Sequence, residues 1–313
     1  MGPRNQIEEM ISKGGSPFFF LFKERSVPVC FQPAHSKTAK TLVVYFHGAV
    51  DRASRKIPVF QPFVSGISSQ AHQISISDPS LLIKGDFGVS WYGGDAKFAS
   101  QVVLRELIEE VVACLGVNRL IFFGSSSGGF AALFFSWHFS GSICICTCPQ
   151  TNVFNYYSGH LDRYWKGCWP QLSHPEDISN YVCMDVCALY SQSFENTVIY
   201  LQSAGDYFHF QTQLVPFLSA ARLRTKGNSL ILENGFWGRL SHSRSVPVSA
   251  VVPWMNAVLI ADSLETDELL TLRHQVGPTV GPSSNEVKGR SHVVSPQDIQ
   301  KANKLSEVLL KKG

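Results

Sequence analysis

Residues 119–139 read RLIFFGSSSGGFAALFFSWHF, and this stretch decides the fold class. It opens with a short apolar run, residues 119–123, that is typical of a buried strand. Six glycine and serine residues follow at 124–129, and such residues suit a tight turn. The next run, residues 130–139, is apolar on every face, as expected for an interior helix. The stretch therefore predicts a strand, a tight turn and a helix.

The same stretch also has the hydropathy of a membrane span. No Asp, Glu, Lys or Arg occurs between Arg119 and Asp162. The glycine and serine residues at 124–129 would interrupt an apolar span, so we reject a membrane-spanning helix for residues 120–139. The alternative, a parallel sheet whose innermost strand and helix are buried on all sides, accounts for the same hydropathy.

The composition indicates a globular protein with a large core. Apolar residues make up 44% of the 313-residue chain and charged residues 16%, below the roughly 25% that is typical. The formal charge is 27 minus 24, or +3, which is too small to predict nucleic acid as a partner. The first residues lack the apolar core of a signal peptide, so the sequence predicts a cytoplasmic location.

The eight cysteines lack the paired spacing of zinc sites and occur mainly in apolar stretches. We expect them to be reduced core residues. Cys144, Cys146 and Cys148 alternate, so on a strand they would face one side, where a soft metal or a disulfide remains an alternative.

Strand and helix patterns alternate along most of the chain, which predicts an α/β fold with a mostly parallel twisted sheet covered by helices on both faces. Strand character occurs at residues 18–22, 27–31, 41–46, 73–77, 143–148, 197–202 and 229–232, and helical character at 98–115 and 248–261. The first two strands should form an antiparallel edge hairpin.

Three regions define the expected domain organisation. Residues 1–262 form one domain, and the aromatic-rich segment at about 149–196 is expected to be an inserted helical cap. Residues 263–313 are expected to contain a Gly, Pro and Ser-rich linker and a C-terminal helix. That helix is either a solvated tail or a contact through which the protein forms an oligomer.

Gly124-x-Ser126-x-Gly128 is the pattern in which a sharp turn from strand to helix exposes a serine hydroxyl. Both glycines are needed because the strand and the helix leave no room for side chains. A plain Ser/Gly loop or a phosphate-binding turn is the alternative, but no Lys stands nearby to bind a nucleotide.

This arrangement resembles the α/β-hydrolase superfamily over roughly residues 16–262. The resemblance implies the α/β-hydrolase fold and a catalytic triad in the order Ser, Asp or Glu, His. Asp206 follows the 197–202 strand after a glycine, and His242 follows the 229–232 strand. In this hypothesis Ser126 attacks the substrate, His242 takes its proton, and Asp206 orients the imidazole.

Other residues compete for these roles. His209 shares the loop of the proposed acid, which would place it poorly as the late-loop base. His47 follows a strand at the front of the sheet, and His138 belongs to an apolar helix, where a core histidine is the default. Asp185 and Glu195 are the alternative acids.

The family also supplies two backbone N–H groups for the oxyanion, one from the residue after the nucleophile and one from a loop that often contains a His-Gly pair. Here these are Ser127 and Ala49, with Gly48 as neighbour. The alternative is an ordinary glycine turn at a strand end. Five further side chains are candidates for the substrate pocket, although packing is an alternative role for them: His47, Trp91, Tyr92, Tyr157 and Trp165.

The resemblance implies a serine-dependent carboxylic ester hydrolase, an esterase or deacetylase, that acts on a small-molecule or glycan ester and needs no cofactor or metal. An alternative is an O-acyltransferase acting on a surface glycan, because the GSSSGG turn is similar to that of hydrolase-fold proteins of bacterial surface-glycan synthesis. A third hypothesis is a catalytically silent binding protein that has kept the fold.

Overall fold

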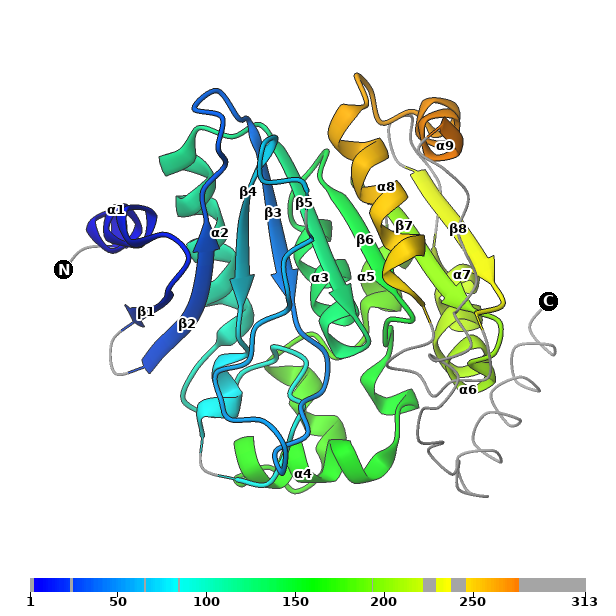
Figure 1. Cartoon of the computed structure of the whole chain (residues 1–313). Helices are drawn as coiled ribbons and strands as arrows, with labels where there is room; N and C mark the ends of the chain where they lie inside the picture. Colours follow the sequence, from blue (N-terminus) through cyan, green and yellow to red (C-terminus); the bar gives the residue numbers. More distant parts are fainter. Residues whose placement is uncertain are drawn as a thin grey trace.

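A computed structural model describes residues 3–22, 25–64, 66–83, 85–192, 194–221, 229–237 and 246–275 of the chain. Within these residues, eight strands form one sheet in the order β1-β2-β4-β3-β5-β6-β7-β8 (Figure 1). The strands are β1 Pro17–Phe22, β2 Arg25–Gln32, β3 Thr41–Phe46, β4 Ala71–Ile76, β5 Arg119–Ser125, β6 Ile143–Thr147, β7 Thr197–Ser203 and β8 Ser229–Gly235.

The pairing directions confirm the predicted α/β class. β1 and β2 form an antiparallel hairpin, β2 is antiparallel to β4, and the strands from β3 to β8 pair in parallel. The carboxyl ends of the parallel strands therefore share one edge of the sheet, and residues that follow those strands are brought together there.

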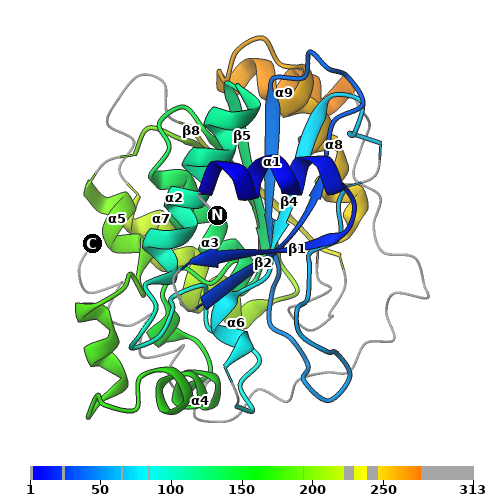
Figure 2. The ribbon, with the colours of Figure 1, turned by 90° about the vertical axis from the view of Figure 1, so that its left-hand side faces the viewer.

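Helices cover both faces of the sheet (Figures 1 and 2). They are α1 Pro3–Lys13, α2 Ser100–Leu115, α3 Ser127–Trp137, α4 Ser158–Cys168, α5 Val186–Gln192, α6 Tyr207–His209, α7 Val215–Ala220, α8 Val248–Ile260 and α9 Thr266–Gln275. Successive residues of β3 alternate between two cores: Val44 and Phe46 pack on the side of α2 and α3, and Val43 and Tyr45 on the side of α8. Burial on both faces explains why the strands read as continuous apolar runs.

The segment between β6 and β7 contains α4, α5 and two 3-10 turns, η2 (Val153–Asn155) and η3 (Pro175–Asn180). Figure 1 shows α4 beyond the carboxyl ends of the parallel strands. The sequence analysis did not anticipate α1 or α9. Helix α9 lies in the segment assigned to the linker, and its Leu269 is fully buried in the same core as α8. The predicted C-terminal helix, within 276–313, lies outside the described residues.

The eight cysteines are free thiols, and five of them are buried, as expected for core residues. Cys30, Cys114 and Cys183 are only half-buried, so the prediction was too broad for these three. Within the described part of the chain, no helix is long and apolar enough to cross a bilayer. Residues 120–139, which mimic a membrane span in the sequence, belong to β5, the turn and α3.

The turn between β5 and α3 is closely packed against its surroundings. A Cβ atom on Gly124 would stand 2.0 Å from the carbonyl oxygen of Gly128, and one on Gly128 would stand 2.2 Å from that of Phe46. A Cβ on Gly129 would stand 2.6 Å from the Cβ of Pro149. These contacts confirm that the neighbouring backbone leaves no room for side chains at the glycines of the motif.

We expect Gly128→Ala to lower the free energy of unfolding by about 1–3 kcal/mol, because backbone atoms must move to admit the methyl group. Urea denaturation measures this change. The control is Gly159→Ala in α4, where the nearest atom to a new Cβ is 3.8 Å away, so we expect no loss there. Equal stability of the two variants would contradict the packing argument.

Candidate active site

Ser126 stands at the tip of the turn between β5 and α3 with φ 59° and ψ −122°. A non-glycine residue at positive φ stores strain of about 1–3 kcal/mol, which must be offset by the surrounding structure. Here the backbone is bonded on both sides: the N–H of Ser126 donates to Thr147 O at 3.0 Å, and its carbonyl accepts from the N–H groups of Phe130 and Gln150 at 3.1 Å. The hydroxyl is thus held at the carboxyl edge of the sheet on a strained turn.

The predicted oxyanion residues lie beside this turn. A Cβ on Gly48 would stand 3.1 Å from Ser125 O and 3.5 Å from the Cβ of Ser126, so the loop after β3 contacts the turn directly. The N–H groups of Ser127 and Ala49 donate no hydrogen bond to any of the described residues. Ser127 begins α3, where the helix dipole favours negative charge. Both amides are thus available donors, and their role in the oxyanion hole stays a prediction.

Asp206 lies just after β7, on the same edge of the sheet, and caps α6. Its Oδ1 accepts a hydrogen bond from the backbone N–H of His209 at 3.3 Å and lies 2.9 Å from the Nδ1 of the same residue. Asp206 is 7% exposed and His209 is fully buried. The two side chains therefore form a buried hydrogen-bonded pair.

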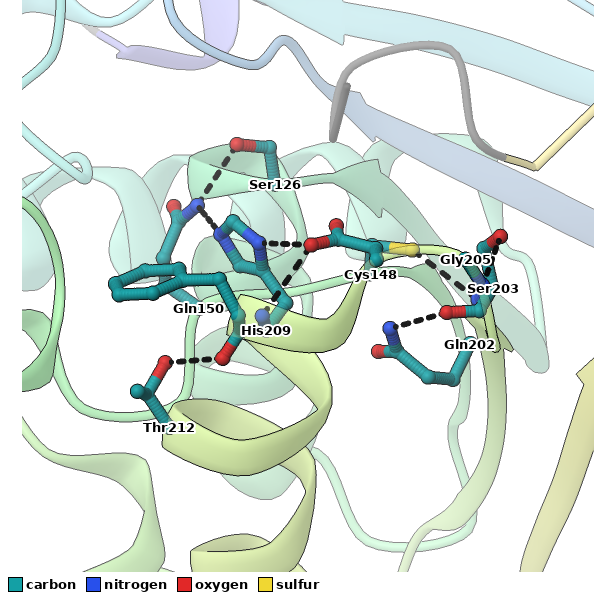
Figure 3. A network of polar contacts seen from close by, with 10 residues as sticks. Ser126, Cys148, Gln150, Gln202, Ser203, Gly205, His209 and Thr212 are labelled. Carbon is teal, nitrogen blue, oxygen red and sulfur yellow. Dashed lines mark hydrogen bonds and ion pairs between the residues drawn. The ribbon is translucent and has the colours of Figure 1, made fainter. Parts of the chain in front are cut away.

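Gln150, which follows β6, joins this pair to the serine (Figure 3). Its Nε2 donates to Ser126 Oγ at 2.9 Å and lies 3.4 Å from the Nε2 of His209. Its Oε1 accepts from the indole N–H of Trp91 at 3.2 Å. Since the amide nitrogen only donates, the network assigns His209 as the neutral tautomer with its proton on Nδ1, facing Asp206.

The sequence analysis missed Gln150 and judged His209 poorly placed. His209 follows Asp206 by three positions on a short helix, and this i, i+3 spacing puts both side chains on one face. That spacing was the available signal. Gln150 offered only the weaker signal of a polar side chain directly after a buried strand.

His242 falls in residues 238–245, between β8 and α8, outside the described residues, so its role as base stays a prediction. The alternative acids have other contacts. Asp185 Oδ1 accepts from the N–H of Cys187 at 2.9 Å at the start of α5, and Glu195 accepts from the hydroxyl of Ser140 at 2.7 Å on the surface. His138 ends α3 and packs against the rings of Phe134 and Trp137, but it is only half-buried and so is not the core histidine that the sequence predicts.

His47 braces the loop after β3, which contains Gly48 and Ala49. It is 5% exposed, its Nδ1 lies 2.7 Å from Gly48 O, and its Nε2 accepts from the N–H of Asp78 at 3.0 Å. Burial lowers the pKa of His47, which agrees with a neutral ring that donates from Nδ1 and accepts at Nε2. The ring therefore fixes the peptide that precedes Ala49.

Asp78 and Tyr92 complete this support. Asp78 Oδ2 accepts from the hydroxyl of Ser90 at 2.6 Å and from the N–H of Tyr92 at 2.8 Å. Burial raises the pKa of Asp78, and these donated hydrogen bonds oppose that shift. The hydroxyl of Tyr92 accepts from the N–H of His47 at 2.8 Å and lies 3.0 Å from Ile76 O, to which it donates. The buried Tyr92 hydroxyl thus joins the ends of β3 and β4 by hydrogen bonds.

We expect Tyr92→Phe to lower the free energy of unfolding by about 1–3 kcal/mol, because the buried N–H of His47 loses its acceptor. The turnover number should also fall several-fold with little change in KM, since Tyr92 supports the oxyanion loop from within the protein. Denaturation and steady-state kinetics measure both effects, with Tyr181→Phe, at a side chain that is 61% exposed, as control. A raised KM at unchanged stability would favour the predicted substrate-binding role.

The remaining predicted pocket residues differ in position. Trp91 is 1% exposed, and through Gln150 its indole joins the network at Ser126. Tyr157 is half-buried, stacks on Phe208 with ring centroids 4.3 Å apart, and lies 6.4 Å from the His209 ring. The indole N–H of Trp165 donates to Leu172 O at 3.1 Å within the segment between β6 and β7. Of the five, Tyr157 has the position that best suits a substrate contact.

Among the described residues, no group of three or more His, Cys, Asp or Glu side chains is placed to hold a metal ion. The site thus combines a hydroxyl on a strained turn, two amide N–H groups beside it that donate to none of the described residues, and a carboxylate–imidazole pair one amide group away. These are the components that acyl transfer through a serine requires.

Comparison with known proteins gave matches in structure. No protein-family model matches the sequence, and no curated protein matches it either. Among solved structures, the chain is similar to the capsule O-acetyltransferase of Neisseria meningitidis serogroup A in complex with CoA, with TM-score 0.51 and 12% identity over 83% of this chain and 93% of that one.

An S-formylglutathione hydrolase from Agrobacterium tumefaciens matches with TM-score 0.52 and 14% identity over 72% of this chain and 87% of that one. An acylaminoacyl peptidase from Pyrococcus horikoshii matches with TM-score 0.56 and 13% identity over 82% of this chain, which spans 43% of the peptidase. At these identities the similarity concerns the fold. The chain has the α/β-hydrolase fold.

Proposed function

We propose that this protein is a serine-dependent enzyme that cleaves carboxylic esters through an acyl-enzyme on Ser126. The observation that supports this most strongly is the backbone of Ser126 at φ 59° between three glycines that admit no side chain. Strain of this kind persists where function requires it. A binding protein that had lost catalysis would have no need of a serine at this strained position.

In the proposed reaction, Ser126 Oγ attacks the ester carbonyl while His242 accepts the hydroxyl proton. Asp206 orients the imidazole and stabilises its positive charge. The N–H groups of Ser127 and Ala49 donate to the oxyanion, and the loss of one such donor costs about 3 kcal/mol of barrier. The imidazolium returns the proton to the leaving alcohol, and water then releases the acid from Ser126 by the same steps.

His209 is the second candidate for the base, because its Nδ1 already bonds to Asp206 and one amide separates its Nε2 from Ser126. An amide nitrogen does not relay a proton, so this role would require Gln150 to move aside. With His242 as base, His209 is a positioning residue that holds the Asp206 carboxylate.

Transfer of the acyl group to a hydroxyl instead of water is the second candidate function. It is favoured by the similarity to a capsule O-acetyltransferase over 83% of this chain. The same nucleophile, base and oxyanion donors would serve both reactions, so the two differ only in which acceptor enters after acylation.

A panel of p-nitrophenyl esters from acetyl to palmitoyl tests the proposed function, with and without an added sugar acceptor. We expect turnover with a preference for the acetyl ester. Transfer to the sugar in competition with water would assign the acyltransferase reaction. A folded protein that turns over no ester and does not react with a fluorophosphonate would contradict both candidate functions.

A further inference from the structure

A cavity of about 300 Å³ lies next to the candidate active site. Residues 49–53 form one side, residues 86 and 88 a second, and His160 and Arg163 of α4 a third. The volume is at the lower end of the range of roughly 300–1,000 Å³ for small-molecule sites. It therefore suits a ligand the size of a single sugar unit.

One wall connects the cavity to the nucleophile. Ala49, a proposed oxyanion donor, lines the cavity, and the preceding Gly48 contacts Ser126. This wall is fixed, because the N–H of Val50 donates to Gly88 O at 2.7 Å and a Cβ on Gly88 would stand 2.0 Å from Val50 O.

The side of the cavity formed by α4 is connected to the candidate active site through aromatic contacts. The ring of His160 stacks on that of Tyr156 with centroids 5.5 Å apart, and Tyr156 lies 5.6 Å from the ring of His209. Burial raises the pKa of Tyr156, so its phenol stays protonated. The cavity is thus linked on two sides to the candidate catalytic groups, through Gly48 to Ser126 and through Tyr156 to His209.

The cavity is lined by both positively and negatively charged side chains. Arg52 and Arg163 provide guanidinium groups, and Asp51 and Asp86 provide carboxylates. Arg52 is held in place by hydrogen bonds to Leu81 O at 2.8 Å and to a second backbone carbonyl at 3.3 Å. The formal charges of these four side chains cancel, so the cavity favours neither an anion nor a cation. The hydroxyl groups of a neutral ligand can donate hydrogen bonds to the carboxylates and accept them from the guanidinium groups.

An acyl chain would fit this lining poorly, because it would remove water from charged groups and return no hydrogen bond. The apolar contribution to the lining comes from two alanines, Val50 and a glycine, with no aromatic ring other than the imidazole. We propose that this cavity binds the polyhydroxylated part of the substrate, a sugar unit whose hydroxyl is esterified or receives the acyl group. This inference rests on the proposed function and names its substrate class.

The test compares two acetyl esters, 6-O-acetylglucose and p-nitrophenyl acetate, by the ratio of their kcat/KM values. In Arg163→Gln we expect this ratio to fall about tenfold or more, the fold-change that matches the loss of a hydrogen bond to a charged group. Asp86→Asn should lower the ratio in the same direction. The control is Arg4→Gln on α1, where the side chain is 78% exposed and pairs with Glu8 on the same helix, so the ratio should not change.

The outcomes separate this inference from the proposed function. A wild-type protein that fails to react with a fluorophosphonate overturns the proposed function. If the protein reacts but the ratio is unchanged in both cavity variants, the sugar site alone is overturned. The same holds if the protein reacts but prefers long-chain esters and leaves the acetylated sugar intact.

Discussion

Ser126→Ala is expected to reduce the turnover number for p-nitrophenyl acetate at least about a thousandfold, because no other group can form the acyl-enzyme. The change removes one oxygen from a side chain that is 5% exposed and leaves the strained backbone as it is. The melting temperature should therefore change by no more than a few degrees, about what 1 kcal/mol produces in a chain of this size.

The matched control is Ser125→Ala, one position earlier, at the last residue of β5. Its side chain has no part in the proposed mechanism, so activity should stay within about a few-fold of the wild type. A Ser126→Ala variant that kept a tenth of the activity would mean that another residue is the nucleophile, or that a general base activates water directly.

The second large effect is expected when the residue that acts as base is replaced. We expect His242→Ala to lower the turnover number by about a thousandfold or more, because the serine hydroxyl then keeps its proton. His209→Asn places an amide N–H near the former Nδ1 and so retains a donor to Asp206. We expect it to lose less than about tenfold in turnover, the cost of one imperfect hydrogen bond.

The two variants are informative only as a pair, measured over a range of pH. If His242 is the base, His209→Asn keeps the acidic limb of the pH–rate profile, which reports protonation of the base. A thousandfold loss in His209→Asn together with near-normal turnover in His242→Ala would transfer the role of base to His209 and require Gln150 to move during the reaction.

Local patterns in the sequence predicted most of the fold. Residues 119–139 have a strand, a turn and a helix in the predicted order, because apolar runs and glycines report on burial and steric space, which are local properties. The helical pattern predicted at residues 98–115 corresponds to α2, which ends before Gly116 at φ 61°. Helix α9 was missed because it carries few apolar residues, and its packing depends on Leu269, which is fully buried.

The candidate active site was less predictable than the fold, because it depends on the directions in which side chains point. The residue types at His47 and Tyr92 suited a substrate pocket, yet both side chains turn inward and bond to the protein. The side chains of Gln150 and His209 contact each other, although the two residues lie far apart in the sequence. Such pairs arise only when β6 and β7 lie side by side in the folded sheet, which no local pattern encodes.

The central claim is that the hydroxyl of Ser126 is a reactive nucleophile. The most direct test treats the folded protein with a fluorophosphonate and locates the adduct by peptide mass spectrometry. We predict one phosphonyl group per chain, attached to Ser126. A folded protein that gains no adduct, or carries it on another residue, would contradict the claim.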